Sequence, residues 1–148
     1  SQSRVYSIHR SFANIDRLRS AMPFELELPF PPSINHFFSY YQGRPVLSKD
    51  ARTYRHQVRR IAIAKSIKPL MGPLAIRIDI APPDDRRRDC DNVQKAVLDA
   101  LQHAGVFWDD SQVVWLLSIK HESQPKGQIK VQIDDAESQT LSPAMEIA

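Results

Sequence analysis

Hydrophobic and polar positions follow a helical period near the middle of the chain. Between residues 92 and 104 apolar side chains recur every three or four positions, which predicts an amphipathic helix. Its apolar stripe consists of Val93, Val97, Leu101 and Ala104. Its polar face consists of Asn92, Lys95, Asp99 and Gln102. Gly105 follows the last periodic residue, where a C-cap glycine is expected to end the helix.

A second helical period begins after Ser48, a predicted N-cap, and continues to a stop near Pro69. Its apolar side consists of Tyr54, Val58, Ile61, Ala62 and Ile63. The other side is basic and carries Arg52, Arg55, Arg59, Arg60, Lys65 and Lys68. A basic helix face is usually only a solvated surface, and contact with a phosphate backbone is the alternative.

Alternation with period two predicts strands in the rest of the chain. Strand-like segments are residues 24–30, 44–48, 74–81, 113–120 and 128–133. Gln42-Gly43 predicts a hairpin turn before the second of these strands, and residues 123–127 predict another turn. We therefore expect an α+β fold with a small mixed sheet of about five strands and two main helices. No regular βαβ repetition is expected.

Composition and length limit the class of protein. A chain of 148 residues with 42% hydrophobic and 25% charged residues is typical of one globular domain. The single cysteine excludes an internal disulfide, and no segment has the roughly 18 apolar residues of a membrane span. These features predict a cytoplasmic protein with no membrane partner. Cys90 itself is interpreted as a small buried hydrophobic residue.

Residue patterns divide the chain into three parts. Residues 1–22 are predicted to be an N-terminal extension, which is either loosely packed or a short amphipathic helix. Residues 23–134 form the predicted folded domain, and residues 135–148 form an acidic tail. The net charge is +3, and residues 134–148 contribute four acidic residues without Lys or Arg, so the first 133 residues carry +7. That asymmetry favours a polyanionic partner.

Carboxylates border the predicted helix at residues 92–104. Asp89 and Asp91 precede it, and Asp109 and Asp110 follow it. Carboxylates that lie close together repel one another unless a proton or a hard cation lies between them, and Mg²⁺ prefers such oxygen ligands. Either acid before the helix, taken alone, is more often only a helix cap. In an extended segment, Asp109 and Asp110 point to opposite sides.

These residues resemble the RusA family of Holliday junction resolvases. The resemblance is carried by Asp89-Cys-Asp91-Asn92-x-x-Lys95, Asp99-Ala-Leu101, Gly105, Asp109-Asp110-x-Gln112-Val113 and an upstream Pro31-Pro32-Ser33-x-Asn35, and it covers about residues 24–134. It implies a homodimeric endonuclease that nicks four-way junction DNA symmetrically in DNA recombination and repair. Cys90 departs from the family, which more often has a larger aliphatic residue there.

The resemblance also implies roles for individual residues. Asp89, Asp91 and Asp110 would bind Mg²⁺, with Mn²⁺ as a substitute, and Lys95 would be an essential basic residue. Asn92 and Asp99 are candidates to support the site, with Asp99 paired to Lys95 one helical turn away. Residues expected to contact DNA are Asn35, Arg52, Arg55, Arg59, Arg86, Arg87 and Arg88.

Other classes stay open on the sequence alone. A non-catalytic, structure-selective nucleic-acid-binding protein would use the basic helix but leave the acidic cluster unexplained. An interaction domain would use its Asp residues only as helix caps and surface ion pairs. Pro83-Asp84 is similar to the start of a PD-(D/E)xK nuclease motif, but the lysine that this motif requires is missing. The aromatic stretch at residues 33–42 suits core or dimer contacts better than DNA contacts.

Overall fold

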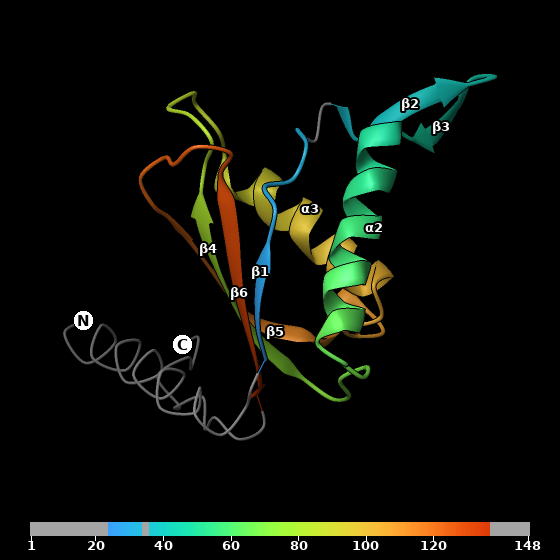
Figure 1. The fold of residues 1–148 in the computed structure, drawn as a ribbon. Helices are drawn as coiled ribbons and strands as arrows, with labels where there is room; N and C mark the ends of the chain where they lie inside the picture. The colour runs from blue at the N-terminus through green and yellow to red at the C-terminus, as the bar shows by residue number, and fades with distance from the viewer. Residues whose placement is uncertain (1–23, 34–35, 137–148) are drawn as a thin grey trace, which may run out of the picture.

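The computed structural model describes residues 24–33 and 36–136, and the predicted extension at residues 1–22 and most of the acidic tail lie outside these ranges. Within them the chain is an α+β fold, as predicted. The elements in chain order are β1 (Phe24–Leu28), β2 (Phe38–Tyr41), β3 (Arg44–Leu47), α2 (Lys49–Ala64), β4 (Leu74–Ala81), α3 (Cys90–His103), the 3-10 turn η2 (Asp110–Gln112), β5 (Val113–Lys120) and β6 (Gln128–Asp135). Figure 1 shows this arrangement.

The main sheet has four strands in the order β1-β6-β4-β5. β6 is antiparallel to both β1 and β4, whereas β4 and β5 are parallel. A parallel pair needs a crossover connection, and α3 provides it. The described chain therefore contains one βαβ unit, β4-α3-β5, which the sequence pattern did not predict.

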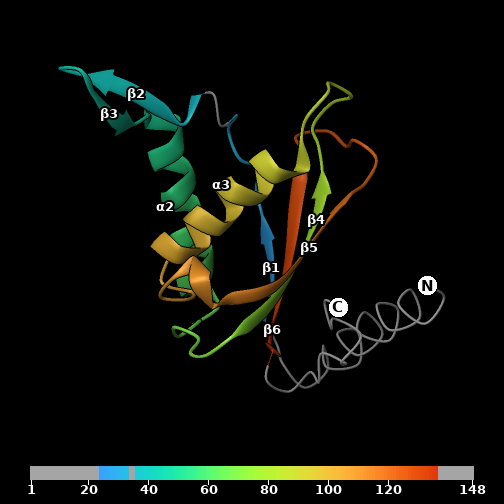
Figure 2. The same ribbon diagram turned by 180° about the vertical axis from the view of Figure 1, so that it is seen from behind.

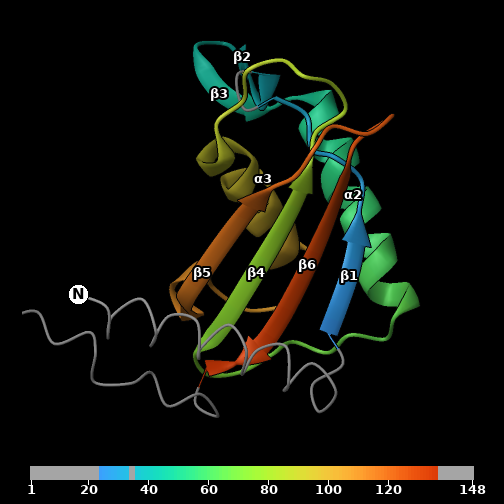
Figure 3. The same ribbon diagram turned by 90° about the vertical axis from the view of Figure 1, so that its left-hand side faces the viewer.

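Both helices cover one face of this sheet, and Figure 3 shows the other face, which no described helix or strand covers and which is called the open face below. The core lies between the helices and the covered face. It contains Leu26 and Leu28 of β1, the isoleucines of β4, Ile129 and Val131 of β6, and Tyr54, Val58, Val97 and Leu101 of the helices. The predicted apolar stripes are confirmed except at Ile63, whose side chain is 64% exposed.

β2 and β3 form a separate two-stranded sheet, which projects beyond the first turn of α2 (Figure 1). The predicted turn is confirmed, since Gln42 and Gly43 both have positive φ angles, 50° and 75°. Two such residues in succession are typical of a tight hairpin turn. Phe37 fixes the root of this hairpin because its buried ring packs with Ala51 of α2 and Ala96 of α3.

Candidate active site at the start of α3

Residues 82–89 connect β4 to α3 and are called the arginine loop here. The loop is fixed from inside by Asp84, whose carboxylate accepts two hydrogen bonds from the Arg88 guanidinium, at 2.6 and 3.1 Å. Asp84 also accepts a hydrogen bond from the Arg86 backbone amide at 3.0 Å. The bonds from Arg88 and then Arg86 lower the pKa of Asp84 to about 2. The Asp84 carboxylate therefore stays ionised, and its ion pair with Arg88, the Asp84–Arg88 clamp, holds the two ends of the loop together.

The connection between β5 and β6, residues 121–127, holds the arginine loop from outside. The Ser123 hydroxyl donates to Asp85 at 2.5 Å, and the Gln124 amide donates to the carbonyl of Pro82 at 2.9 Å. A Cβ at Gly127 would lie 2.9 Å from the Cβ of Phe30 and 3.0 Å from the backbone nitrogen of Pro83, so only glycine permits this approach. The path of the chain into α3 is thus set by contacts with the connection between β5 and β6.

Asp89 and Asp91 lie where α3 begins, as predicted. Asp89 is the N-cap residue, but its side chain makes no capping hydrogen bond, and Asp91 lies in the first turn. Both side chains are exposed, and neither has a hydrogen bond or ion pair with another residue in the described part of the chain. Capping does not account for Asp89, because a cap side chain bonds the free amides of the first turn. Two free carboxylates therefore face solvent at the positive end of a helix.

Lys95 is exposed and lies four residues after Asp91, on the same side of α3. The predicted pair between Lys95 and Asp99 is wrong. Asp99 instead accepts two hydrogen bonds from Arg55 of α2, at 2.8 and 2.9 Å. This half-buried, two-pronged pair joins the two helices and leaves the Lys95 ammonium group unengaged by described residues.

Asp109 and Asp110 lie at the opposite end of α3. Asp109 caps the short turn η2 by accepting from the Ser111 amide at 3.2 Å, and the Asp110 amide donates to the Gln102 side chain at 3.3 Å. The two carboxyl groups do not diverge as an extended segment would require. A hydrogen bond between them raises the pKa of Asp110, whereas the Ser111 amide and then Asp110 lower the pKa of Asp109.

Within the chain, Asp110 does not lie near Asp89 and Asp91. Gln102, which contacts Asp110, follows Asp89 by 13 residues, so the axial separation is about 20 Å at 1.5 Å per helical residue. Two oxygen ligands of one Mg²⁺ lie within about 4 Å of each other. Among the described residues, no three carboxylate, imidazole or thiol groups are close enough to bind one metal ion. Figure 2 shows the two ends of α3 well separated.

The residues predicted to contact DNA differ in what they do. Arg52 and Arg59 are exposed on α2, and Arg86 and Arg87 are exposed on the arginine loop, where Nε of Arg86 lies 3.7 Å from the Asp84 carboxylate. Arg55 and Arg88 are occupied by Asp99 and Asp84 in structural pairs. Arg88 also lies over the Phe30 ring, 5.5 Å from its centroid. Asn35 lies outside the described residues.

Sequence reasoning missed Lys120, the last residue of β5. Its ammonium group donates to the carbonyl of Arg88 at 3.2 Å, directly before Asp89, and its side chain is exposed. An ammonium group has three protons, so Lys120 retains donors for an anion at this place. A lone lysine at a strand end carries no sequence signal. Only the parallel pairing of β4 with β5 brings it to the loop.

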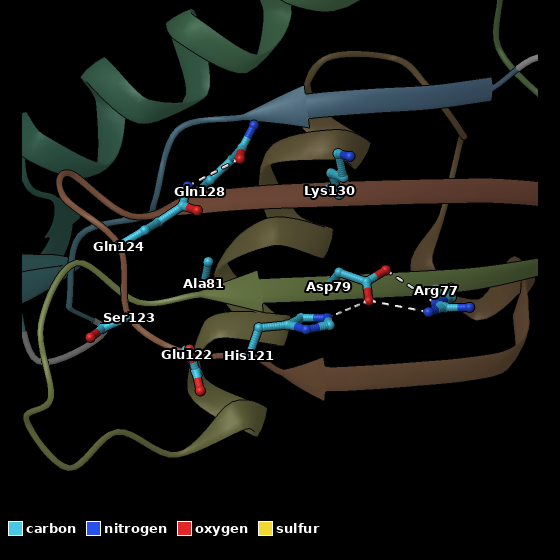
Figure 4. Close-up of a pocket in the computed structure, with 9 residues that line it drawn as sticks. All are labelled: Arg77, Asp79, Ala81, His121, Glu122, Ser123, Gln124, Gln128 and Lys130. Carbon is cyan, nitrogen blue, oxygen red and sulfur yellow. Dashed lines mark hydrogen bonds and ion pairs between the residues drawn. The ribbon is translucent and has the colours of Figure 1, made fainter.

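A polar pocket of about 670 Å³ lies on the open face of the sheet (Figure 4). Its centre is Asp79, which accepts hydrogen bonds from the Arg77 guanidinium at 3.1 and 3.3 Å and lies 2.7 Å from Nε2 of His121. His121 begins the connection that holds the arginine loop, and its amide donates to the carbonyl of Ile80 at 2.7 Å. This network lies on the face of the sheet away from the helices. It fixes His121, the first residue of the connection that contacts the arginine loop.

The combination of free carboxylates, nearby cations and a rigid loop at a helix start is typical of enzymes that act on phosphodiesters. The family model described as "Endodeoxyribonuclease RusA" matches residues 29–134. This chain belongs to the RusA family, which confirms the resemblance seen in its sequence.

Curated relatives agree over most of their length. A protein of Enterobacteria phage 82 named crossover junction endodeoxyribonuclease is 38% identical over 113 residues, covering 76% of this chain and 94% of the phage protein. Proteins with the same name from Shigella sonnei and Escherichia coli K12 match with the same identity and coverage. The match thus includes nearly the whole of each relative.

Proposed function

We propose that this protein is a crossover junction endodeoxyribonuclease that resolves four-way DNA by paired, symmetric nicks in recombination and repair. The observation that carries the proposal is the pair Asp89 and Asp91, exposed and unpartnered among described residues at the start of α3. Membership of the RusA family and the names of its relatives support the same activity. No helix in the described residues is long and apolar enough to cross a membrane. A cytoplasmic location is part of the proposal.

The donor atoms at this place fit Mg²⁺, with Mn²⁺ as a substitute. Magnesium sites in proteins often use only one or two carboxylates, while water and substrate phosphate complete the coordination. Asp89 and Asp91 supply two such carboxylates. When bound, the ion would polarise the scissile phosphate and lower the pKa of a water molecule.

The remaining roles fall to side chains that lie beside these carboxylates. Lys95 projects from the same side of α3 as Asp91, so its ammonium group would contact the negatively charged phosphate. Lys120 would contact the same strand from the side of β5. Arg86 and Arg87 would bind neighbouring phosphates without reading bases. The Asp84–Arg88 clamp would hold the backbone of the loop that carries Arg86 and Arg87 in place before substrate binds.

The proposed assembly is a homodimer. Paired nicks in a four-way junction require two active sites related by a two-fold axis. The position of Asp110 adds a second reason, because it lies about 20 Å along α3 from Asp89. If two copies of α3 run antiparallel across a two-fold axis, the start of one helix meets the end of the other. Asp110 of the partner subunit would then complete each site.

Cleavage of labelled DNA tests the proposal. Purified protein is incubated with a four-way junction or with a linear duplex of the same sequence, each with Mg²⁺ or with excess chelator. We expect nicks at symmetric positions in the junction only, and only with Mg²⁺. Tight junction binding without any nicks in Mg²⁺ or Mn²⁺ would instead support the non-catalytic binding protein.

A further inference from the structure

The hairpin β2-β3 exposes several large apolar side chains that the proposed chemistry does not use. Phe38 is 56% exposed, Tyr40 is 78% exposed and Tyr41 is 68% exposed. Side chains on a strand alternate between faces, so Tyr40 and Tyr41 lie on opposite faces of the hairpin. Their cross-strand partners are Pro45 and Arg44. Both faces of this narrow ribbon therefore carry an exposed ring.

The hairpin is anchored at its root by packing against both helices. Phe37 is buried against α2 and α3, and its carbonyl accepts a hydrogen bond from the Ser48 amide at 2.9 Å. The ring of Phe38 packs edge-on against Phe37, with centroids 5.9 Å apart. Ala96 belongs to α3, so this root packs on the helix that begins at the candidate active site. The rings are thus placed by the element that begins with Asp89 and Asp91.

Charge favours a polyanion over a second protein surface. The sequence Phe38–Leu47 contains no acidic residue and one arginine, Arg44, at the tip. Exposed rings on both faces of the hairpin allow it to contact a partner on two sides. A flat protein partner would cover one face. The branch point of a four-way junction offers base pairs on two sides, and aromatic rings stack on any base.

We propose that the β2-β3 hairpin is a wedge that inserts at the branch point of the junction and stacks Tyr40 and Tyr41 on separated bases. The inference rests on the proposed function and deepens it, since it explains how the protein selects branched DNA over duplex. Apolar wedges unstack base steps in many DNA-bending proteins. The active site alone contacts phosphates, which junctions and duplexes share.

The test uses a synthetic junction with 2-aminopurine next to the branch point, whose fluorescence rises when it unstacks. Wild-type protein should raise the fluorescence, whereas the Tyr40→Ala, Tyr41→Ala double variant should not. Loss of stacking at each ring should weaken junction binding by roughly 5- to 150-fold. Binding to linear duplex should stay unchanged. The matched control is Tyr40→Phe with Tyr41→Phe, which keeps both rings and should behave as the wild type.

Each other outcome has a defined meaning. If wild type cleaves junctions and the alanine variant unstacks 2-aminopurine equally well, the wedge is refuted and the nuclease stands. If the alanine variant becomes monomeric by sedimentation and loses duplex binding as well, the hairpin is a dimer contact, which also refutes the wedge. If wild type does not prefer junctions over duplex, the proposed function itself fails. Tyr40→Ser alone provides a second variant should the double variant fold poorly, because it leaves the ring on the other face.

Discussion

The two ends of α3 each carry two aspartates, but the pairs are built differently. At the start, Asp89 and Asp91 make no hydrogen bond or ion pair with described residues, and Lys120 donates to the carbonyl of Arg88, directly before Asp89. At the end, Asp109 is occupied as a cap, and its hydrogen bond raises the pKa of Asp110. The carboxylates of the first pair have no hydrogen-bonding or ionic partner among described residues, whereas in the second pair Asp109 opposes the ionisation of Asp110.

The largest expected effect is at the start of the helix. Asp91→Asn keeps the size of the side chain but removes the charge that a bound cation needs. We expect cleavage to fall at least ~100-fold, roughly 2.7 kcal/mol of transition-state stabilisation, with junction binding retained. Asp50→Asn is the matched control, because Asp50 is also an exposed acid in the first turn of a helix. Equal cleavage activity in the Asp91→Asn and Asp50→Asn variants would show that Asp91 is not an active-site residue.

Asp110→Asn should cause a comparable loss if Asp110 of the partner subunit completes the site. A mixture of Asp91→Asn and Asp110→Asn chains then separates the two ends of the helix. A mixed dimer has both changes in one composite site and none in the other, so about a quarter of the wild-type sites should return in an equal mixture. Those dimers should make single nicks. Absence of any recovery, with mixed dimers verified by mass, would place the ligands of each site within one chain.

The pattern of hydrophobic and polar residues along the sequence predicted more of the fold than of the candidate active site. The apolar stripes of α2 and α3 and the alternation in β4 depend on residues close in sequence, and they are confirmed. Asp99 was assigned to Lys95 because that residue is one turn away, yet Arg55 is 44 positions distant and offers a two-pronged bond in a half-buried place. Sequence spacing cannot rank a near partner against a distant one.

The position of Asp110 shows the same limit. A helix period predicts that α3 exists, but the direction of the chain after Gly105 depends on tertiary contacts of Gln112. Its side chain donates to the carbonyls of Leu70 and Gly72 and accepts from the Trp108 amide. These contacts keep the segment at the end of α3. The family resemblance implies a role for Asp110, but it does not say whether Asp110 would act with Asp89 and Asp91 of the same chain or of a partner subunit.

A smaller effect separates the basic residues of α2. Arg59 is exposed, so Arg59→Ala should leave thermal stability unchanged and, if Arg59 contacts a phosphate, reduce the slope of log affinity against log salt by about 0.9. Arg55 holds Asp99, so Arg55→Ala should lower the free energy of unfolding by about 1 kcal/mol. Melting curves and salt titrations on the two variants provide the comparison. If Arg55→Ala instead changed the slope of log affinity against log salt without lowering stability, Arg55 would be a DNA-contacting residue rather than a structural one.

The smallest effect concerns protonation at the two ends of the helix. The pKa of Asp84, beside the start of α3, is lowered to about 2, so its contribution to folding is present above its ordinary pKa and is lost as pH falls through about 2. The pKa of Asp110 is raised, so its bond with Asp109 is fully present below the ordinary pKa and is lost as pH rises through the raised value. Carboxyl NMR titration of metal-free protein should therefore find that Asp110 is protonated before Asp84 as pH is lowered. Arg88→Gln removes the guanidinium that holds Asp84 ionised, so it should move the Asp84 midpoint back toward its usual range and leave Asp110 unchanged. Equal midpoints for Asp84 and Asp110 in the wild-type protein would contradict the difference between the two ends.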